Sequence, residues 1–417
     1  MAQIRDALVE SNPWWRGKFT LDYKARQVYG EIQRFMKLPQ MIALTGLRRV
    51  GKTTLMFKLV EDAIAHSFDP RNILYFSFDE FREARTRQLL SEYEALLERG
   101  LDKGRYLVLL DEVQKLSNWE DQLKALYDRH GKRLKIVISG SESLFIRKGS
   151  RESLAGRLFE FRVDPLSFRE YLIFRNVAYE PVGLYEKELA RLFGEFVLTQ
   201  GFPELVGVRD KLVARKYIQE SIVEKVVFRD LPTILKIRDV SLLESLLNIL
   251  IEEPGQLIDL SSLGGELKVS RHTLSSYLTY LEHAFLLRKL YNYSAGRRKV
   301  ERKLRKYYPT VMSADLLFSS DEISKSKVLE CTIVNQLKAE FFWRDPYKNE
   351  VDVILTNGKP TPIEVKYGKP DMGGLAAFAR RRKIGKAYVI SDRVEEDRRL
   401  NGTTVSVIPC YKFLLTL

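Results

Sequence analysis

The residues best suited to chemistry in this chain form the run Gly46-Leu47-Arg48-Arg49-Val50-Gly51-Lys52-Thr53-Thr54, which matches the pattern G-x-x-x-x-G-K-[ST]. The two glycines of this pattern let the backbone curl tightly, so that its N–H groups face phosphate oxygens. Lys52 can reach the terminal phosphates of a nucleotide, and the hydroxyl of Thr53 can bind Mg²⁺. The run therefore predicts a nucleotide-binding loop with ATP and Mg²⁺ as cofactors.

The segments on either side of this loop support the prediction. Residues 41–44 are apolar, as in a buried strand, and a helical pattern follows the loop at Leu55, Met56, Leu59, Val60 and Ile64. A loop between strand and helix gains the positive end of the helix dipole for binding phosphate. The other interpretation, a glycine-containing turn with a chance lysine, is disfavoured by this context.

A second acidic motif lies farther along the chain. Residues 106–110 form a continuous apolar run, typical of a strand covered on both faces, and Asp111 and Glu112 follow it. This is the Walker B pattern, in which Asp111 would hold the Mg²⁺ shell and Glu112 would orient or deprotonate the attacking water. Such positioning and charge stabilisation account for most of phosphoryl transfer.

A third predicted strand, residues 134–138, runs into Ser139, Gly140 and Ser141. A polar residue at this strand end could sense the γ-phosphate, and we favour Ser141 over Ser139. A simple Ser/Gly turn is the alternative. The strands predicted at 73–78, 107–110 and 135–138 alternate with helical stretches, a pattern that indicates a parallel sheet with helices on both faces.

Several strings together resemble a known family. They are Arg48-Arg49-Val50-Gly51-Lys52-Thr53, Glu152-Ser153-Leu154-Ala155-Gly156-Arg157-Leu158, Asp164-Pro165-Leu166-Ser167-Phe168-Arg169-Glu170-Tyr171-Leu172 and Gln200-Gly201-Phe202-Pro203-Glu204. The chain resembles prokaryotic AAA-family P-loop ATPases, best represented in archaea, with a C-terminal domain of the DUF4143 type. The resemblance covers roughly residues 20–235 well and the rest more loosely.

This resemblance implies an oligomeric ATPase in which an arginine completes the site, often from a neighbouring subunit. Arg157 is the candidate, because an arginine finger neutralises charge on the transferred phosphate. A structural arginine at a helix start is the alternative. Leu47 stands where many relatives carry proline, in a tolerant part of the loop.

Residues around 240–300 predict a winged helix. Helices are expected at 241–250 and 260–267, and Ser270 can cap a third with apolar residues at helical spacing. That helix would expose Arg271, His272 and Ser275 to a DNA groove. A basic stretch follows the strand at 285–290 and would contact phosphates, with the members Arg297, Arg298, Lys299, Arg302, Lys303, Arg305 and Lys306. The alternative is a scaffold with a solvated basic hairpin.

The last hundred residues place acids on three predicted elements. Glu330 lies on a helix expected at 328–341, Asp352 on a strand at 350–355, and Glu364 with Lys366 on a strand at 362–366. A hairpin would bring Asp352 and Glu364 together, and Glu364 and Lys366 share one strand face. The arrangement resembles the PD-(D/E)XK nuclease-like fold, which implies Mg²⁺ on Asp352 and Glu364 and an activating lysine. The alternative is that these charges are structural.

Composition limits the remaining choices. The 417 residues allow two to four domains of roughly 100–200 residues. A formal net charge of +14 favours a polyanionic partner, although Lys, Arg and Glu enrichment also occurs in heat-adapted proteins. Neither a signal peptide nor a membrane span is expected. The two cysteines lack disulfide or metal spacing, which suits a reducing cytoplasm.

These observations predict an α/β protein with four parts. They are a P-loop AAA+ core at 1–163, a helical lid at 164–235, a winged helix at 236–305 and a restriction-endonuclease-like α/β domain at 306–417. The predicted function is an oligomeric, Mg²⁺-dependent ATPase acting on DNA. The alternatives are a slow nucleotide-dependent switch in defence or signalling, and an ATP-gated nuclease. Stimulation of ATP hydrolysis by DNA would separate the motor from the switch.

Overall fold

The computed structural model describes residues 2–81, 84–141, 154–232, 237, 239–294, 305–356, 358–368, 372–400 and 402–416. The chain divides into two compact units, Met1–Pro165 (unit 1) and Leu166–Leu417 (unit 2). The nucleotide loop and Asp111 belong to unit 1. The C-terminal acids and the candidate DNA-binding helix belong to unit 2.

Unit 1 is built on a sheet of five parallel strands in the order β2-β3-β4-β1-β5. These strands are β1 (Met41–Thr45), β2 (Ile73–Ser77), β3 (Tyr106–Asp111), β4 (Leu134–Gly140) and β5 (Leu158–Arg162). The side chains of β1 and β3 are all buried, as expected for strands covered on both faces. The predicted parallel sheet is confirmed, and the P-loop strand β1 lies beside β4.

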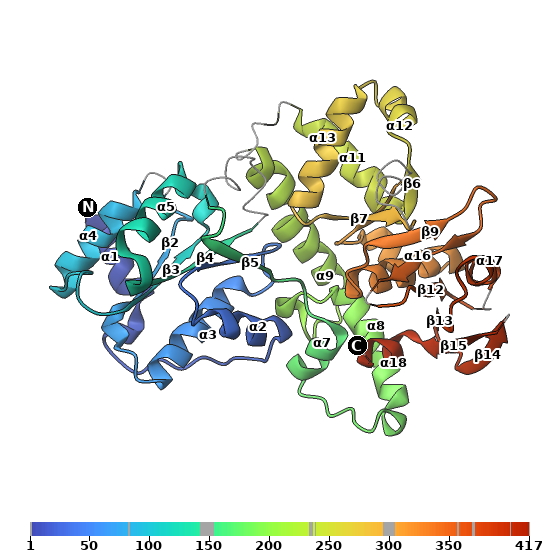
Figure 1. Cartoon of the computed structure of the whole chain (residues 1–417), viewed down its shortest axis with the longest axis horizontal. Helices are drawn as coiled ribbons and strands as arrows, with labels where there is room; N and C mark the ends of the chain where they lie inside the picture. The colour runs from blue at the N-terminus through green and yellow to red at the C-terminus, as the bar shows by residue number, and fades with distance from the viewer. Residues whose placement is uncertain are drawn as a thin grey trace. The chain divides into compact units, whose positions relative to one another are not determined.

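Helices cover this sheet on both sides (Figure 1). They are α1 (Ala2–Ser11), α2 (Gln27–Phe35), α3 (Lys52–Ala65), α4 (Thr86–Leu97) and α5 (Trp119–His130). The segment after α1 follows the outer strand β2. There Asn12 exchanges two hydrogen bonds with Tyr75, and the indoles of Trp14 and Trp15 donate to the carbonyl of Ile73. This contact covers an edge that would otherwise expose unpaired backbone groups.

Unit 2 begins with a helical stretch. Its helices are α7 (Phe168–Phe174), α8 (Glu186–Thr199) and α9 (Lys211–Ile218), and α9 continues into two π-helical segments, η7 (Gln219–Val223) and η8 (Lys225–Asp230). Ser167 and Glu170 form a capping box at the start of α7, which satisfies donors that the first helical turn leaves free.

Three helices and a strand hairpin come next in unit 2. In chain order they are α11 (Val240–Glu252), β6 (Gln256–Ile258), α12 (Leu260–Glu266), α13 (Arg271–His283), β7 (Leu287–Asn292) and β8 (Arg305–Pro309). Strand β8 pairs antiparallel with both β6 and β7. Ser270 accepts a hydrogen bond from the backbone N–H of Thr273, so the predicted cap of the third helix is confirmed.

The rest of unit 2 completes one five-stranded sheet and adds a second. The elements of this region are α15 (Ala314–Phe318), α16 (Glu322–Gln336), β9 (Phe341–Arg344), β10 (Glu350–Val351), β11 (Val353–Leu355), β12 (Thr361–Lys366), α17 (Gly373–Arg382), β13 (Lys386–Ser391), β14 (Glu396–Leu400), β15 (Thr403–Pro409) and α18 (Cys410–Leu415). One sheet has the order β10-β9-β7-β8-β6 and the other β11-β12-β13-β15-β14. The predicted hairpin is confirmed as β11 paired with β12.

Two predicted elements of this region were wrong in extent. The helix expected at 328–341 begins earlier and ends at Gln336, and residues 341–344 are strand β9, because Lys338 turns the chain at φ 51°. The strand expected at 350–355 is broken at Asp352: β10 pairs with β9 in one sheet, and β11 pairs with β12 in the other. Asp352 therefore lies where the chain passes from one sheet to the next.

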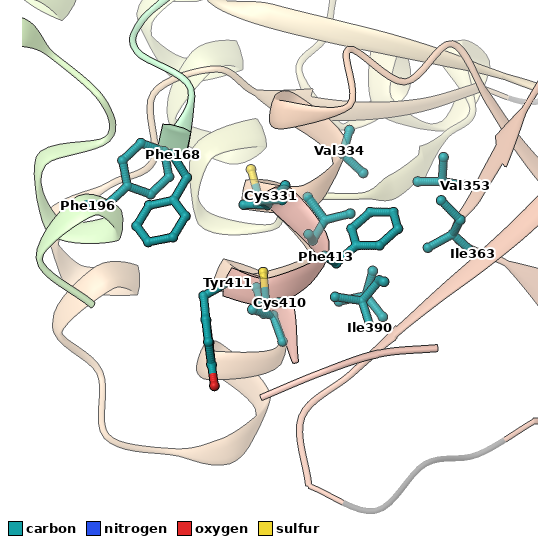
Figure 2. Packing of buried hydrophobic residues seen from close by; sticks show 14 of the residues in the cluster. Phe168, Phe196, Cys331, Val334, Val353, Ile363, Ile390, Cys410, Tyr411 and Phe413 are labelled. Carbon is teal, nitrogen blue, oxygen red and sulfur yellow. The ribbon is translucent and has the colours of Figure 1, made fainter. Parts of the chain in front are cut away.

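One apolar core joins the parts of unit 2. Figure 2 shows Phe168 and Phe196 of the helical stretch near Cys331 of α16 and Cys410 of α18, with Ile363 of the sheet in the same cluster. Both cysteines are free and buried, and burial raises the pKa of each thiol. They behave as packing residues, because a thiol without a thiolate form is a poor nucleophile.

Candidate nucleotide site and a second cluster of acids

The nucleotide loop connects the end of β1 to the first residue of α3. Gly46 and Gly51 have φ values of 149° and 93°, and a Cβ atom on Gly46 would lie 2.1 Å from the carbonyl oxygen of Val163. Only glycine fits at position 46 for this reason. The Nζ atom of Lys52 donates to the carbonyls of Gly46 and Leu47, at 3.0 and 2.9 Å. The ammonium group is therefore held against the loop that would receive phosphates.

Arg26 supports this loop, although no sequence motif points to it. The guanidinium of this buried arginine donates to the carbonyl of Val50 at 2.8 Å and to that of Asp164 at 2.7 Å. The residue thus ties the loop to the chain that follows β5. An isolated arginine ahead of a helix belongs to no motif, so only the fold shows this contact.

Asp111 accepts hydrogen bonds from the two neighbouring strands, β2 and β4, and from helix α3. Its Oδ2 atom accepts from the hydroxyl of Thr53 at 2.7 Å and from that of Tyr75 at 2.9 Å, and its Oδ1 atom accepts from the hydroxyl of Ser139. Burial, then the charge of Asp111, raises the pKa of Tyr75, which stays a neutral donor. A hydroxyl and a carboxylate in contact suit a shared Mg²⁺ ion, because hard cations prefer oxygen ligands.

Glu112 stands beside Asp111 with a left-handed backbone conformation, φ 55°. Burial raises the pKa of its carboxyl group, while the nearby charges of Lys52 and Arg48 lower it. A carboxyl group with a raised pKa accepts a proton more readily near neutral pH, which suits a group that orients or deprotonates water. Its backbone N–H donates to the hydroxyl of Ser139 at 3.2 Å.

The two candidate sensor serines occupy different environments. Ser139 contacts Asp111 and the backbone of Glu112, whereas Ser141 accepts a hydrogen bond from the amide of Gln114 at 3.2 Å. Both serines are buried at the end of β4. The choice between them as the phosphate sensor stays a prediction.

Arg157 lies at the opposite end of the sheet from the loop. Its carbonyl accepts from the N–H of Met41, at the start of β1, whereas Thr45, before the loop, pairs with Arg162. At about 3.3 Å per residue the intervening strand spans roughly 15 Å. The guanidinium instead pairs with Asp128 of α5 at 2.9 Å. This placement does not suit a role in the site of its own chain, and a role in a neighbouring subunit's site stays a prediction.

The predicted C-terminal site residues lie in one cluster of unit 2, here named the acid cluster. Its members are Glu330, Asp352, Glu364 and Lys366, together with Lys306, Tyr308 and Glu350. Lys306 is buried, and its Nζ atom lies 2.5 Å from Glu350 and 3.7 Å from Glu330. Tyr308 donates to Glu330 at 2.5 Å. Lys306, expected on an exposed basic stretch, is therefore a buried counter-ion, because β8 carries it beside α16 and β10.

Asp352 and Glu364 form the other half of the acid cluster. Asp352 accepts from the backbone N–H of Val365 at 2.8 Å, and Glu364 pairs with Lys366 at 2.7 Å. Burial raises the pKa of both carboxyl groups, and for Asp352 the next cause is the charge of Glu364. The lysines Lys306 and Lys366 oppose these shifts.

The fit of this cluster to a metal ion rests on one atom. The Oε2 atom of Glu364 is buried and has no hydrogen-bond partner within the described residues, so a cation there would satisfy it. Among the residues that the structure describes, no group of three or more His, Cys, Asp or Glu side chains is arranged as a metal site. Asp352 and Glu364 can supply two ligands, with further positions left to solvent or substrate.

The predicted DNA-binding residues divide into two groups. Arg271 and His272 are exposed in the first turn of α13, and Ser275 on the next turn is partly exposed. Arg297, Arg298 and Lys299 lie outside the described residues. No helix in the part of the chain that the structure describes is long and apolar enough to cross a membrane.

Comparison with known proteins identifies parts of the chain. A family model described as an AAA domain matches residues 38–172, and models of two domains of unknown function, DUF8612 and DUF4143, match residues 190–310 and 327–413. An uncharacterized protein of Methanocaldococcus jannaschii is 26% identical over 400 residues, covering 92% of this chain and 85% of that protein.

Two further similarities were found. An uncharacterized protein of Haemophilus influenzae is 27% identical over 272 residues, covering 64% of this chain and 66% of that protein. Among solved structures, the Walker-type ATPase of Pyrococcus abyssi gives a TM-score of 0.46 at 17% identity, covering 71% of this chain and 96% of that one. The chain, with its loop, Walker B acids and parallel sheet, contains an AAA domain at residues 38–172 and a DUF4143 domain at residues 327–413.

Proposed function

We propose that this protein is an Mg²⁺-dependent ATP hydrolase of the AAA kind that acts on DNA through unit 2. The observation that carries the proposal is the hydrogen bond of 2.7 Å between Thr53 and Asp111. It joins the nucleotide loop to the acidic strand end across the sheet. Within this arrangement Lys52 would neutralise terminal phosphates, and Glu112 would orient the attacking water.

The DNA part of the proposal rests on α13 and its surroundings. Three helices followed by an antiparallel strand pair have the order of a winged helix, and α13 would be its recognition helix. The first turn of α13 exposes Arg271 and His272, and the net charge of the chain is +14. Arg297, Arg298 and Lys299, which follow β7 in the sequence, would add phosphate contacts.

Assembly and location complete the proposal. In a homo-oligomer Arg157 would contact the nucleotide of a neighbouring subunit. It would not contact that of its own chain, because the sheet places Arg157 far from the loop. The free, buried cysteines agree with a reducing compartment, so we propose a cytoplasmic protein. The alternative is a slow nucleotide-dependent switch, whose ATP hydrolysis would not respond to DNA.

Arg271→Glu tests the DNA interface. We expect its affinity for a labelled duplex to fall about tenfold or more, because the exposed cation is replaced by a charge that phosphates repel. Fluorescence anisotropy at two salt concentrations measures this, together with ATP hydrolysis with and without duplex and branched DNA. Lys103→Glu, the same charge change at an exposed site of unit 1, is the control.

The two outcomes of this test are distinct. Stimulation of hydrolysis by DNA in the parent and in Lys103→Glu, with loss in Arg271→Glu, supports a DNA-coupled ATPase. Hydrolysis that ignores DNA in all three proteins, with no duplex binding, would reject the DNA part of the proposal. The protein would then be better described as a nucleotide-dependent switch.

A second candidate function is Mg²⁺-dependent DNA cleavage by the acid cluster. The observation in its favour is the convergence of Glu330, Asp352, Glu364 and Lys366, with the Oε2 atom of Glu364 unpaired within the described ranges. Asp352 and Glu364 would hold the ion, and Lys366 would steady the charge that develops on the attacked phosphate. The arrangement resembles PD-(D/E)XK nucleases.

Asp352→Asn tests this second candidate. We expect any Mg²⁺-dependent cleavage of plasmid or branched DNA to fall at least about a hundredfold, because a neutral amide replaces one of the two proposed anionic ligands. ATP hydrolysis, which depends on unit 1, should be unchanged. Glu340→Gln, an exposed acid of the same unit, should cut normally. Cleavage that persists in Asp352→Asn would rule out the acid cluster as its source.

A further inference from the structure

Gln114 connects the candidate sensor serine to the candidate catalytic glutamate. It lies on the single helical turn η3 (Val113–Lys115), which begins directly after Glu112. Its side-chain Nε2 atom donates to the Oε2 atom of Glu112 at 2.6 Å and to the hydroxyl oxygen of Ser141 at 3.2 Å. Its Oε1 atom is buried without a hydrogen-bond partner in the described part of the chain.

The backbone around Gln114 allows this double contact. Strands β3 and β4 are parallel neighbours, so their carboxyl ends bring Glu112 and Ser141 to the same edge of the sheet. The left-handed conformation of Glu112 then turns the chain into η3. An amide nitrogen carries two hydrogens, and here each has its own acceptor.

We propose that Gln114 is a positioning residue that couples the state of Ser141 to the orientation of the Glu112 carboxylate. The proposal rests on the proposed ATPase function. Ser141 accepts from Gln114, so its own hydroxyl hydrogen can be donated to a phosphate oxygen. A phosphate bound there would polarise the chain from Ser141 through Gln114 to Glu112, since linked hydrogen bonds strengthen one another.

The test uses the full chain with Gln114→Ala, Ser141→Ala and the double variant, measured by steady-state phosphate release. For Gln114→Ala we expect kcat to fall about tenfold or more, with KM within about twofold. Because coupled residues act as a unit, the double variant should be no slower than the slower single variant. Gln114→Met, which keeps a side chain of similar length without the donor and without a charge, should resemble Gln114→Ala.

The outcomes separate this inference from the ATPase proposal. Parent activity that Lys52→Ala abolishes would establish hydrolysis at the loop. In that case, an unchanged kcat in both Gln114 variants, or additive losses in the double variant, would reject the coupling alone. A parent that neither binds nor hydrolyses ATP would reject both. Thermal unfolding of each variant shows whether it is folded, and Gln114→Met keeps the test open if Gln114→Ala is not.

Discussion

Lys52→Ala should lower ATP hydrolysis at least about a hundredfold and leave unit 1 folded. The Nζ atom of Lys52 is held at the loop by two carbonyl oxygens, so the lysine places a positive charge where the terminal phosphates would lie. Removing one charge-stabilising group of this kind typically costs about 10²–10³ in kcat. The folded state should tolerate the change, because the aliphatic stem of Lys52 is a small part of the buried core.

Phosphate release with saturating ATP and Mg²⁺ measures the effect, and circular dichroism reports the fold. Lys58→Ala is a matched control on the same helix, since Lys58 pairs with Glu61 and Asp62 rather than with the carbonyls of the loop. The control should keep nearly all of the activity. A Lys52→Ala protein that hydrolyses ATP as fast as the parent would show that the loop is not the hydrolytic site.

Lys306→Met should destabilise unit 2 by about 3–5 kcal/mol, the usual cost of removing one partner of a buried ion pair. The ammonium group is buried beside Glu350 and Glu330, so Glu330 would lose its counter-ion and Glu350 would keep only Arg344. Methionine keeps the length of the side chain and its contact with the ring of Phe342, so the loss would report the charge.

Urea unfolding followed by circular dichroism measures this loss, and hydrogen exchange of the amides of β12 assigns it to unit 2. Lys216→Met is the control, because Lys216 forms an exposed ion pair with Glu220 that is worth about 0–1 kcal/mol. Equal stability of Lys306→Met and the parent would mean that Lys306 does not neutralise the acid cluster.

The pH dependence of this variant gives a second check. Burial, the largest single effect, lowers the pKa of Lys306, but the neighbouring acids together outweigh it and raise the pKa above its ordinary value. A raised lysine pKa stabilises the fold at every pH below the unfolded value of about 10.4. In Lys306→Met the carboxylates lose the ammonium charge, and protonation at low pH relieves their mutual repulsion. The stability difference between variant and parent should therefore be smaller at pH 5 than at pH 8.

The sequence by itself determined the nucleotide loop and the Walker B acids. Their information is local: the glycines and Lys52 must follow one strand within a few residues, and Asp111 must end another. The carboxyl ends of parallel strands meet at one edge of a sheet, so the 2.7 Å contact between Thr53 and Asp111 follows once the strands are correct. The helix cap at Ser270 was predictable for the same local reason.

Only the tertiary structure decided the roles that depend on which strands are neighbours. Lys306 looks like part of a basic run in the sequence, but β8 buries it against Glu350 and Glu330. Asp352 looks like the middle of one strand, yet it lies between two sheets, because β10 pairs with β9 and β11 pairs with β12. Gln114 donates a hydrogen bond to Ser141 because β3 and β4 are adjacent. Residue types and spacing record what a side chain can do, whereas its partners are set by packing between elements far apart in the chain.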